Sequence, residues 1–275
     1  MNNLFEHQPN NVCRIKASES VNWLLAHGVS SITTNDFAAL LGIPNNHIPQ
    51  RMAALKRRNA IVTPAQGLWI PVPPEYMTWG APPAIEVINA IMNHLRTEYY
   101  IGWLSAAELH GASHHAPQVF QVATSKSIRA RVVGRSRFIF YRREHIKQVP
   151  LIQIETKSSM VSVSSIETTL LDISNDISIV GGIDNAANLI IELCETNEID
   201  IDAVVTISKN YPITAIRRLG FLLENFTETP GLNQLRAECE KRNASISILD
   251  PQMHPNGLLD AGWKIKVNRE VSPDV

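Results

Sequence analysis

The sequence has few cysteines and no long apolar run, and both absences narrow the class of protein. Three cysteines, Cys13, Cys194 and Cys239, are scattered through 275 residues without a CxxC pair. We therefore expect neither a disulfide framework nor a structural zinc site, which fits a cytoplasmic protein. No stretch of 18 apolar residues is present, so we expect no membrane span and no membrane partner. Residues 1–8 also lack the basic start and apolar core of a secretory signal.

The sequence also lacks the short motifs of common enzyme classes. It contains no GxSxG, HExxH, P-loop or GxGxxG pattern. A histidine cluster lies beside an acidic residue and is interrupted by a glycine: Glu108, His110, Gly111, His114 and His115. The glycine is expected to end the helix on which a zinc pair would lie, and no third ligand follows at a fitting spacing. We expect ordinary loop histidines, no metal, no cofactor and no enzymatic activity.

Charge is scarce and unevenly distributed. Charged residues make up 19% of the chain and hydrophobic residues 44%, which is enough apolar material for folded cores. The net charge of −1 hides an asymmetry, since residues 1–147 carry 15 basic and 8 acidic side chains whereas residues 148–275 carry 10 and 18. A segregated charge of this kind indicates that the first half can face phosphates and that the second half repels them.

Residues 15–71 have the pattern of a winged helix-turn-helix. Apolar periodicity, with a Thr33–Asp36 capping pair and Gly42 as a helix stop, predicts three helices. Two short strands joined by a Pro64–Gly67 turn follow. The expected elements are helices over 18–27, 34–41 and 46–59, and strands over 60–63 and 68–70.

The third of these helices is the candidate for DNA recognition, because it combines an apolar stripe with a polar face. Ile48, Met52 and Leu55 are expected to face inward. The polar residues near its start are expected to reach base edges, the basic residues near its end to bind phosphates, and the turn of the wing to enter a minor groove. These candidates are Asn46, His47, Gln50 and Arg51, then Lys56, Arg57 and Arg58, and finally Gln66. The alternative is an ordinary solvated face or a protein-interaction module.

The remaining sequence predicts an α+β fold in which a mixed α/β middle and a largely helical C-terminal region follow the winged helix-turn-helix. We expect domains over 1–75 and 84–275, a proline-rich linker over 76–83, and a sub-boundary near 164. Five prolines within 71–83 favour a stiff extended connection. Helices are expected over 84–95, 100–109, 165–174, 183–195, 200–209, 212–225 and 230–242. Strands are expected over 118–124, 129–133, 136–142, 150–156, 160–164, 245–249 and 263–267.

A strongly basic hairpin is predicted around Gly134. Strand alternation puts Arg129 with Arg131, and Arg135 with Arg137, on common faces. Like charges brought opposite each other repel, so the array indicates an anionic partner such as nucleic acid or the acidic C-terminal region. The candidate anion-binding or antitoxicity residues are Arg129, Arg131, Arg135, Arg137, Arg142 and Arg143. The alternative is a solvated strand face with scattered ion pairs.

Three segments resemble the AbiE-type abortive-infection antitoxins, the AbiEi family. The run YYIGWLSAAELHG over 99–111 and the run APQVFQVAT over 116–124 resemble the family's signature helix and strand. The run VSSIETTLLD over 163–172 resembles its "SxExTLLD" segment, with Ile166 where the family often has proline. The resemblance covers residues 15–225, and the last 40 or so residues resemble no family.

This resemblance implies an antitoxin of a type IV toxin–antitoxin pair that is also a transcriptional autorepressor. It implies that the N-terminal domain binds repeats in the protein's own promoter as double-stranded DNA. It further implies that the C-terminal part counters a nucleotidyltransferase-like toxin, without a stable complex. Two other hypotheses remain open: a stand-alone regulator with a ligand-sensing C-terminal domain, and an enzyme such as a nuclease that uses the histidine and arginine region.

Overall fold

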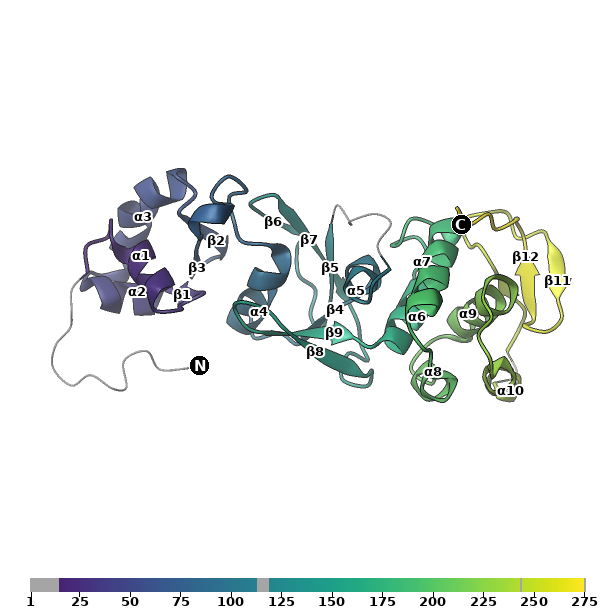
Figure 1. The fold of residues 1–275 in the computed structure, drawn as a ribbon. Helices are drawn as coiled ribbons and strands as arrows, with labels where there is room; N and C mark the ends of the chain where they lie inside the picture. Colours follow the sequence, from purple (N-terminus) through teal and green to yellow (C-terminus); the bar gives the residue numbers. More distant parts are fainter. Residues whose placement is uncertain (1–14, 113–118, 243, 275) are drawn as a thin grey trace. The chain divides into compact units, whose positions relative to one another are not determined.

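The structure, a computed structural model, describes residues 15–112, 119–242 and 244–274. Within these residues the chain forms ten α-helices, two short 3-10 helices and three β-sheets, which is a mixed α+β architecture (Figure 1). The chain divides into two compact units. Unit 1 contains residues up to Thr97 with 131–138 and 156–160, and unit 2 contains 98–130, 139–155 and the residues from Val161 onward. The expected boundaries at 75 and 83 remain a prediction.

Unit 1 begins with three helices and a small antiparallel sheet. The helices are α1 (Ser20–Ala26), α2 (Thr34–Leu41) and α3 (Ile48–Arg57), with a 3-10 turn η1 (Asn45–His47) before α3. The strands are β1 (Ile32–Thr33), β2 (Ile61–Ala65) and β3 (Leu68–Pro71), in the order β1-β3-β2. Figure 1 shows the three helices beside this sheet. Their apolar faces share one core that includes Leu24, Phe37 and Trp69.

Local sequence signals fix the ends of α2 and the start of α3. The Thr33 hydroxyl accepts a hydrogen bond from the Asp36 backbone N–H at 3.2 Å and donates one to the Asp36 carboxylate at 2.7 Å. Gly42, at φ 65°, closes α2 in the left-handed conformation. Pro49 lies in the first turn of α3, where no intrahelical N–H donor is required. These boundaries agree with the prediction, whereas the two-residue strand β1 was not predicted.

The proline-rich segment differs from the extended connection that its composition predicted. Pro71 belongs to β3, and Pro74–Tyr76 forms the 3-10 turn η2. Val72 and Ala81 are buried, so the segment packs against unit 1. A proline in the first turn of a helix costs nothing, because its missing N–H has no partner there. Helix α4 (Ala84–His94) follows as predicted.

A hairpin belongs to unit 1 although it lies far along the chain. Strand β6 (Arg131–Val133) pairs antiparallel with β7 (Ser136–Arg142), whose first three residues are in unit 1. The turn is Gly134–Arg135, and Gly134 adopts φ 59°. A Cβ at Gly134 would lie 2.6 Å from the Trp79 carbonyl oxygen, so this close approach requires glycine.

Unit 2 is built on a mixed sheet in the order β7-β5-β4-β9-β8. Its strands besides β7 are β4 (Tyr99–Ile101), β5 (Phe120–Thr124), β8 (Leu151–Glu155) and β9 (Met160–Ser164). Strand β4 pairs antiparallel with β5 and parallel with β9. The helix α5 (Trp103–Leu109) follows β4 directly.

The prediction of a helix over 100–109 was wrong at its start. Tyr99–Ile101 is the strand β4, and Gly102 is extended, so the helix begins only at Trp103. A Cβ on Gly102 would lie 3.0 Å from the Tyr100 ring and 3.4 Å from the Asp172 carboxylate. A short apolar run is compatible with either a strand or a buried helix. Residues 99–101 form a strand because β5 and β9 pair with them on both sides.

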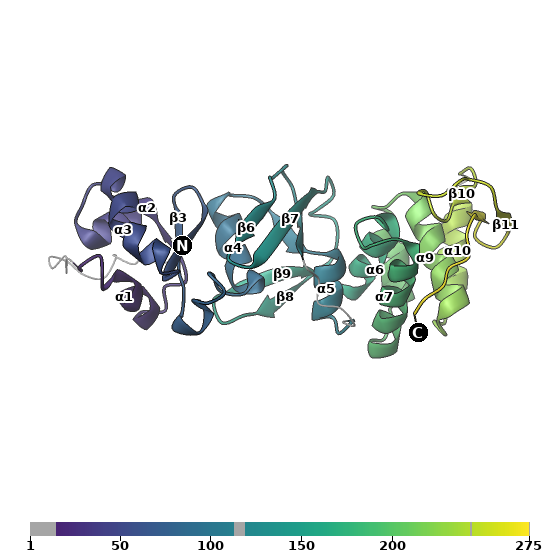
Figure 2. The same ribbon diagram turned by 90° about the horizontal axis from the view of Figure 1, so that it is seen from above.

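The C-terminal region of unit 2 is largely helical, as predicted. Its helices are α6 (Ile166–Asn175), α7 (Ile183–Thr196), α8 (Ile201–Ser208), α9 (Ile213–Phe226) and α10 (Leu232–Lys241). Figure 2 shows α6, α7, α9 and α10 side by side. Their apolar faces form the main core together with Trp103 and Trp263.

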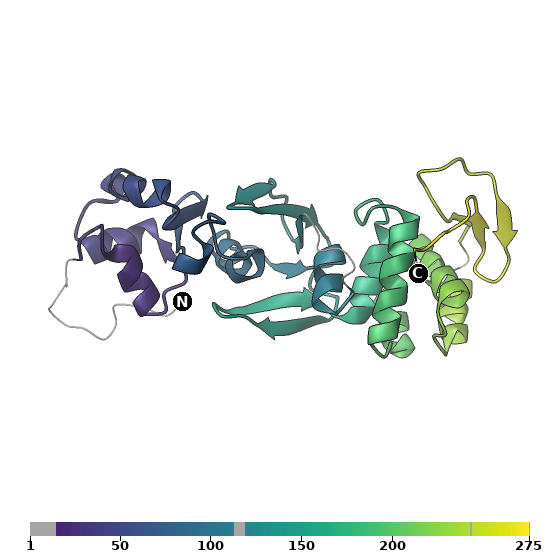
Figure 3. The ribbon, with the colours of Figure 1, turned by 45° about the horizontal axis from the view of Figure 1, so that its top comes forward.

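A small three-stranded sheet ends the described chain and lies next to α9 (Figure 3). Its strands are β10 (Ser247–Ile248), β11 (Leu258–Asp260) and β12 (Ile265–Val267), in the order β10-β12-β11. Strands near 245–249 and 263–267 were predicted, and β11 was not. The Trp263 indole packs so closely on Gly220 of α9 that a side chain there would overlap it.

Candidate functional site

Helix α3 has two chemically distinct faces. Ile48 and Met52 are fully buried and Leu55 is 4% exposed. The side chains on the opposite face are exposed, and they include the predicted Gln50, Arg51, Lys56, Arg57 and Arg58. The inward stripe therefore agrees with the prediction, and the polar face is available to a partner.

The first two predicted base contacts lie just before α3. Asn46 and His47 belong to the 3-10 turn η1, and both are exposed. The side-chain amide of the neighbouring Asn45 donates to the side-chain oxygen Oδ1 of Asn35 at 2.5 Å, which connects η1 with α2. The turn thus places Asn46 and His47 at the start of the same exposed face.

The basic side chains of α3 are unpaired within the described chain. Arg51, Lys56, Arg57 and Arg58 make no side-chain hydrogen bond or ion pair to any described residue. An exposed cation without an acidic partner keeps its positive potential and can neutralise a phosphate with release of counterions. The arrangement is suited to an anionic polymer.

The turn between β2 and β3 is held in place from two sides. Gln66, the predicted minor-groove contact, is exposed at this turn. Its backbone carbonyl lies 2.9 Å from the His94 ring nitrogen Nε2. The Trp69 indole N–H donates to the Thr34 hydroxyl at 2.9 Å. These contacts hold the β2–β3 hairpin against α4 and α2.

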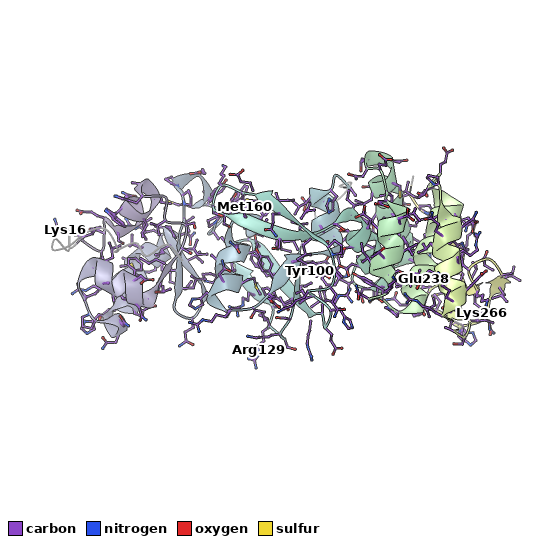
Figure 4. The ribbon with its side chains drawn as sticks, turned by 90° about the horizontal axis from the view of Figure 1, so that it is seen from below. Lys16, Tyr100, Arg129, Met160, Glu238 and Lys266 are labelled. Atoms are coloured by element: carbon purple, nitrogen blue, oxygen red, sulfur yellow. The ribbon has the colours of Figure 1, made fainter. Side chains whose placement is uncertain are left out.

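The six predicted arginines of the basic hairpin are divided between the two units. Arg131, Arg135 and Arg137 belong to unit 1, whereas Arg129, Arg142 and Arg143 belong to unit 2. Arg129 is exposed (Figure 4), and the Arg142 guanidinium lies 3.6 Å from the Glu144 carboxylate. Arg131 is half-buried and donates to the Pro64 carbonyl at 2.8 Å. Of the three predicted arginines in unit 1, Arg135 and Arg137 are exposed and have no partner among the described residues.

The prediction that Arg143 is an anion-binding or antitoxicity residue was wrong, because carboxylates of the same unit already bind its guanidinium. Its guanidinium donates to Asp172 at 2.8 Å and also pairs with Asp176. It lies over the Trp103 ring at 4.9 Å from the ring centroid. Arg143 is therefore a structural cation and is not free for an external anion.

Asp172 is the centre of this buried network. Its side chain is fully buried and accepts hydrogen bonds from the Tyr100 hydroxyl at 3.0 Å and the Tyr211 hydroxyl at 2.9 Å, besides Arg143. Burial raises the pKa of Asp172 to about 6, although Arg143 and the two hydroxyls oppose that rise. Sequence reasoning did not assign Asp172 a site; the signal was an acidic residue inside the apolar run Leu170–Ile173.

The histidine cluster has no metal-binding arrangement within the described chain. The His110 ring nitrogen Nε2 lies 2.7 Å from the Ser164 carbonyl. His114 and His115 lie outside the described residues. Among the residues described, no three His, Cys, Asp or Glu side chains group in a way that holds a metal ion. Cys194 and Cys239 are free, and Cys13 falls outside the described part.

A pocket of about 590 Å³ in unit 2 borders Tyr100, Arg143 and Tyr211, the side chains that contact Asp172. It is lined by Tyr100, the segment 142–145, Gln148, Val149 and the segment 209–212.

In the described chain, no helix is both long and apolar enough to cross a membrane.

The structure is therefore a two-unit α+β protein. Unit 1 presents a basic helix without partners among the described residues, and unit 2 contains a buried network of Arg143 with Asp172 and Asp176. Residues 100–225 match the family model described as the AbiEi antitoxin C-terminal domain, in agreement with the predicted resemblance to that family.

One solved structure resembles the chain over nearly its full length. It is the crystal structure of the RV2827C protein from Mycobacterium tuberculosis, with a TM-score of 0.65 and 14% identity, covering 94% of each chain. At this identity the likeness shows a shared fold. The sequence matches none of the curated proteins.

Proposed function

We propose that this chain is the antitoxin of a type IV toxin–antitoxin pair and a repressor that binds double-stranded DNA in its own promoter. The observation that carries the DNA-binding half is the exposed face of α3, where four basic side chains have no partner in the described chain. The observation that carries the antitoxin half is the AbiEi domain over residues 100–225.

The order of elements in unit 1 supports a winged helix-turn-helix. Helix α2 and helix α3 are separated by a short turn, and the β2–β3 hairpin follows as the wing. In such folds the second helix enters the major groove and its first turns contact base edges. We assign base contacts to Asn46, His47, Gln50 and Arg51, and phosphate contacts to Lys56, Arg57 and Arg58. We assign the minor groove to Gln66.

The antitoxin acts on a nucleotidyltransferase-like toxin encoded beside it, without a stable complex between the two proteins. This part rests on the AbiEi domain and on the properties that the family resemblance implies. We further propose that the protein acts in the cytoplasm, where its DNA lies, and that it is not an enzyme.

The DNA-binding half is tested by fluorescence anisotropy with the protein's own upstream duplex and a scrambled duplex of equal length. Both duplexes are measured at two salt concentrations. Tight, salt-sensitive and sequence-selective binding is expected, since phosphate contacts give the salt dependence and base contacts give the selectivity. Binding to neither duplex would reject the regulator and make unit 1 a protein-interaction module.

The antitoxin half is tested by growth rescue with the neighbouring gene expressed from an unrelated promoter. Rescue by the full chain is expected, and it should persist in the Arg51→Ala variant because the AbiEi match does not include α3. Using an unrelated promoter separates rescue from repression. A neighbouring gene that is not toxic, or toxicity that the chain leaves unchanged, would contradict the proposal.

A stand-alone regulator with a ligand-sensing C-terminal domain is the second candidate. The pocket of about 590 Å³ in unit 2 favours it, because small-molecule sites are usually concave and largely preformed. A shift of the melting temperature by cell-derived small molecules, together with absence of rescue, would support this alternative.

A further inference from the structure

The β6–β7 hairpin packs on unit 1 with one face and exposes the other. In the pairing register, Arg131 lies opposite Phe138 and Val132 opposite Arg137. Residues opposite each other share a face of a hairpin. Val133 and Phe138 are buried, whereas Val132 is 72% exposed and Arg137 is exposed. Arg137 therefore lies on the face turned away from the packing contact.

The buried face of the hairpin is anchored next to the wing. The Arg131 guanidinium donates to the Pro64 carbonyl of β2 at 2.8 Å. Strands β2 and β6 are neighbours in unit 1. A charged donor bound to a backbone carbonyl is stronger than a neutral hydrogen bond, so this contact fixes the hairpin against the wing strand.

The tip of the hairpin lies close to the C-terminal end of α3. A Cβ on Gly80 would lie 3.2 Å from the Gly134 Cα and 3.9 Å from the Asn59 Cγ. The Asn59 side chain also donates to the Met77 carbonyl at 3.1 Å. Asn59 directly follows Arg58. The loop around Gly80 thus connects the basic end of α3 with the turn that carries Arg135.

Arg135 and Arg137 have the same properties as the basic residues of α3. Both are exposed, and neither has a hydrogen bond or ion pair to a described residue. Their backbone is held by the Arg131 and Gly134 contacts, so little ordering of the hairpin is needed when an anion binds. Lys56, Arg57, Arg58, Arg135 and Arg137 all belong to unit 1, and the Gly80 loop joins the backbone segments that carry them.

We infer that the β6–β7 hairpin is a second phosphate-binding element of the DNA interface, in which Arg135 and Arg137 contact the duplex backbone beyond the turns read by α3. This inference rests on the proposed DNA binding of unit 1. It assigns the two arginines to DNA instead of to antitoxicity, the role that the sequence left open for them. Phosphate contacts carry no base information, so the hairpin adds affinity without selectivity.

The test is the double variant Arg135→Ala/Arg137→Ala, measured by anisotropy on the upstream and scrambled duplexes over a salt series. Affinity should fall by a similar factor on both duplexes. The slope of log affinity against log salt should flatten by about 2, close to one for each lost phosphate contact. Growth rescue should be retained. Lys241→Ala is the control for loss of a positive charge, because Lys241 already lies 3.8 Å from Glu238.

The outcomes separate this inference from the proposed function. Wild-type protein that binds neither duplex rejects both. Wild-type binding that depends on Arg51, with an unchanged affinity and slope in the hairpin variant, overturns the hairpin alone. Loss of rescue in the hairpin variant at equal protein level also overturns the assignment to DNA. If the variant melts at a lower temperature, Arg135→Gln/Arg137→Gln replaces it, and the slope should again flatten by about 2 because both charges are removed while most of each side chain is kept.

Discussion

The two units use the same kind of side chain in opposite ways. In unit 1 the basic side chains of α3 and the hairpin turn are exposed and have no partner among the described residues. In unit 2 most arginines are engaged by carboxylates or backbone carbonyls of that unit: Arg143, Arg217, Arg218, Arg236, Arg242 and Arg269. The number of basic residues therefore does not identify a binding surface. An arginine stabilises the fold where carboxylates or carbonyls of the same unit bind it, and it is available to a ligand where they do not.

Helix α9 shows how far this internal use extends. Arg217 is 1% exposed and Arg218 is 3% exposed, although they are adjacent in the sequence. The Arg218 Nε donates to the Leu249 carbonyl at 2.7 Å, and Arg217 donates to the Ala244 carbonyl at 3.1 Å. Burial lowers the pKa of Arg218 to about 10, which leaves it charged at neutral pH. The two side chains fasten the segment leading to the last sheet onto α9.

The largest effect on stability is expected for Arg143→Ala. Its removal leaves the fully buried Asp172 without its cation and opposite Asp176. Breaking a buried pair costs about 3–5 kcal/mol, because the remaining charge is uncompensated. Chemical denaturation of this variant beside Arg137→Ala measures the contrast. An equal, small loss of unfolding free energy in both variants would contradict the structural role of the unit 2 arginine.

The same network should make the Arg143→Ala defect depend on pH. The folded-state pKa of Asp172 is already raised to about 6 and should rise further without Arg143. A raised carboxyl pKa contributes stability at low pH that is lost as pH rises through the folded value. We expect the difference in the free energy of unfolding between wild type and Arg143→Ala to widen by roughly 2 kcal/mol between pH 5 and 8. A gap that narrows with pH would show that Asp172 is not the group left unpaired.

The smallest effect on stability is expected for Arg57→Ala/Arg58→Ala. Both side chains are exposed and unpaired within the described chain, and such surface substitutions usually change the free energy of unfolding by less than about 0.5 kcal/mol. Binding to both duplexes should nevertheless weaken, with a flatter salt slope. Denaturation measures the expected small change in stability, and anisotropy on the same preparation measures the expected loss of DNA binding. Reduced stability with unchanged DNA binding would reverse the expected roles.

The sequence predicted most helices, because their signals are local. The capping pair Thr33–Asp36 and the stop at Gly42 mark α2 as the structure has it. The apolar period of 3.6 located α6 to α10 within about two residues. The buried stripe of Ile48, Met52 and Leu55 on α3 was also predicted, and with it the exposed polar face.

What the sequence did not predict depends on partners distant in the chain. Arg143 meets Asp172 and Asp176 across 29 and 33 residues, and no local spacing indicates such a pair. The strand β4 is selected by pairing with β5 and β9, although its residues also suit a helix. The hairpin was predicted as a basic array, but its anchoring by Arg131 to Pro64 requires contact between residues 67 positions apart.

The proposed reading of base edges by α3 is tested most directly by the Arg51→Ala variant. The measurement is the ratio of affinities for the upstream and scrambled duplexes, for wild type and variant at one salt concentration. Arg51 is exposed and unpaired in the described chain, so the melting temperature should not change. We expect the ratio to fall by the equivalent of about 1–3 kcal/mol, the contribution of one specific base contact. An unchanged ratio in a folded variant would contradict the assignment of α3 as the recognition helix.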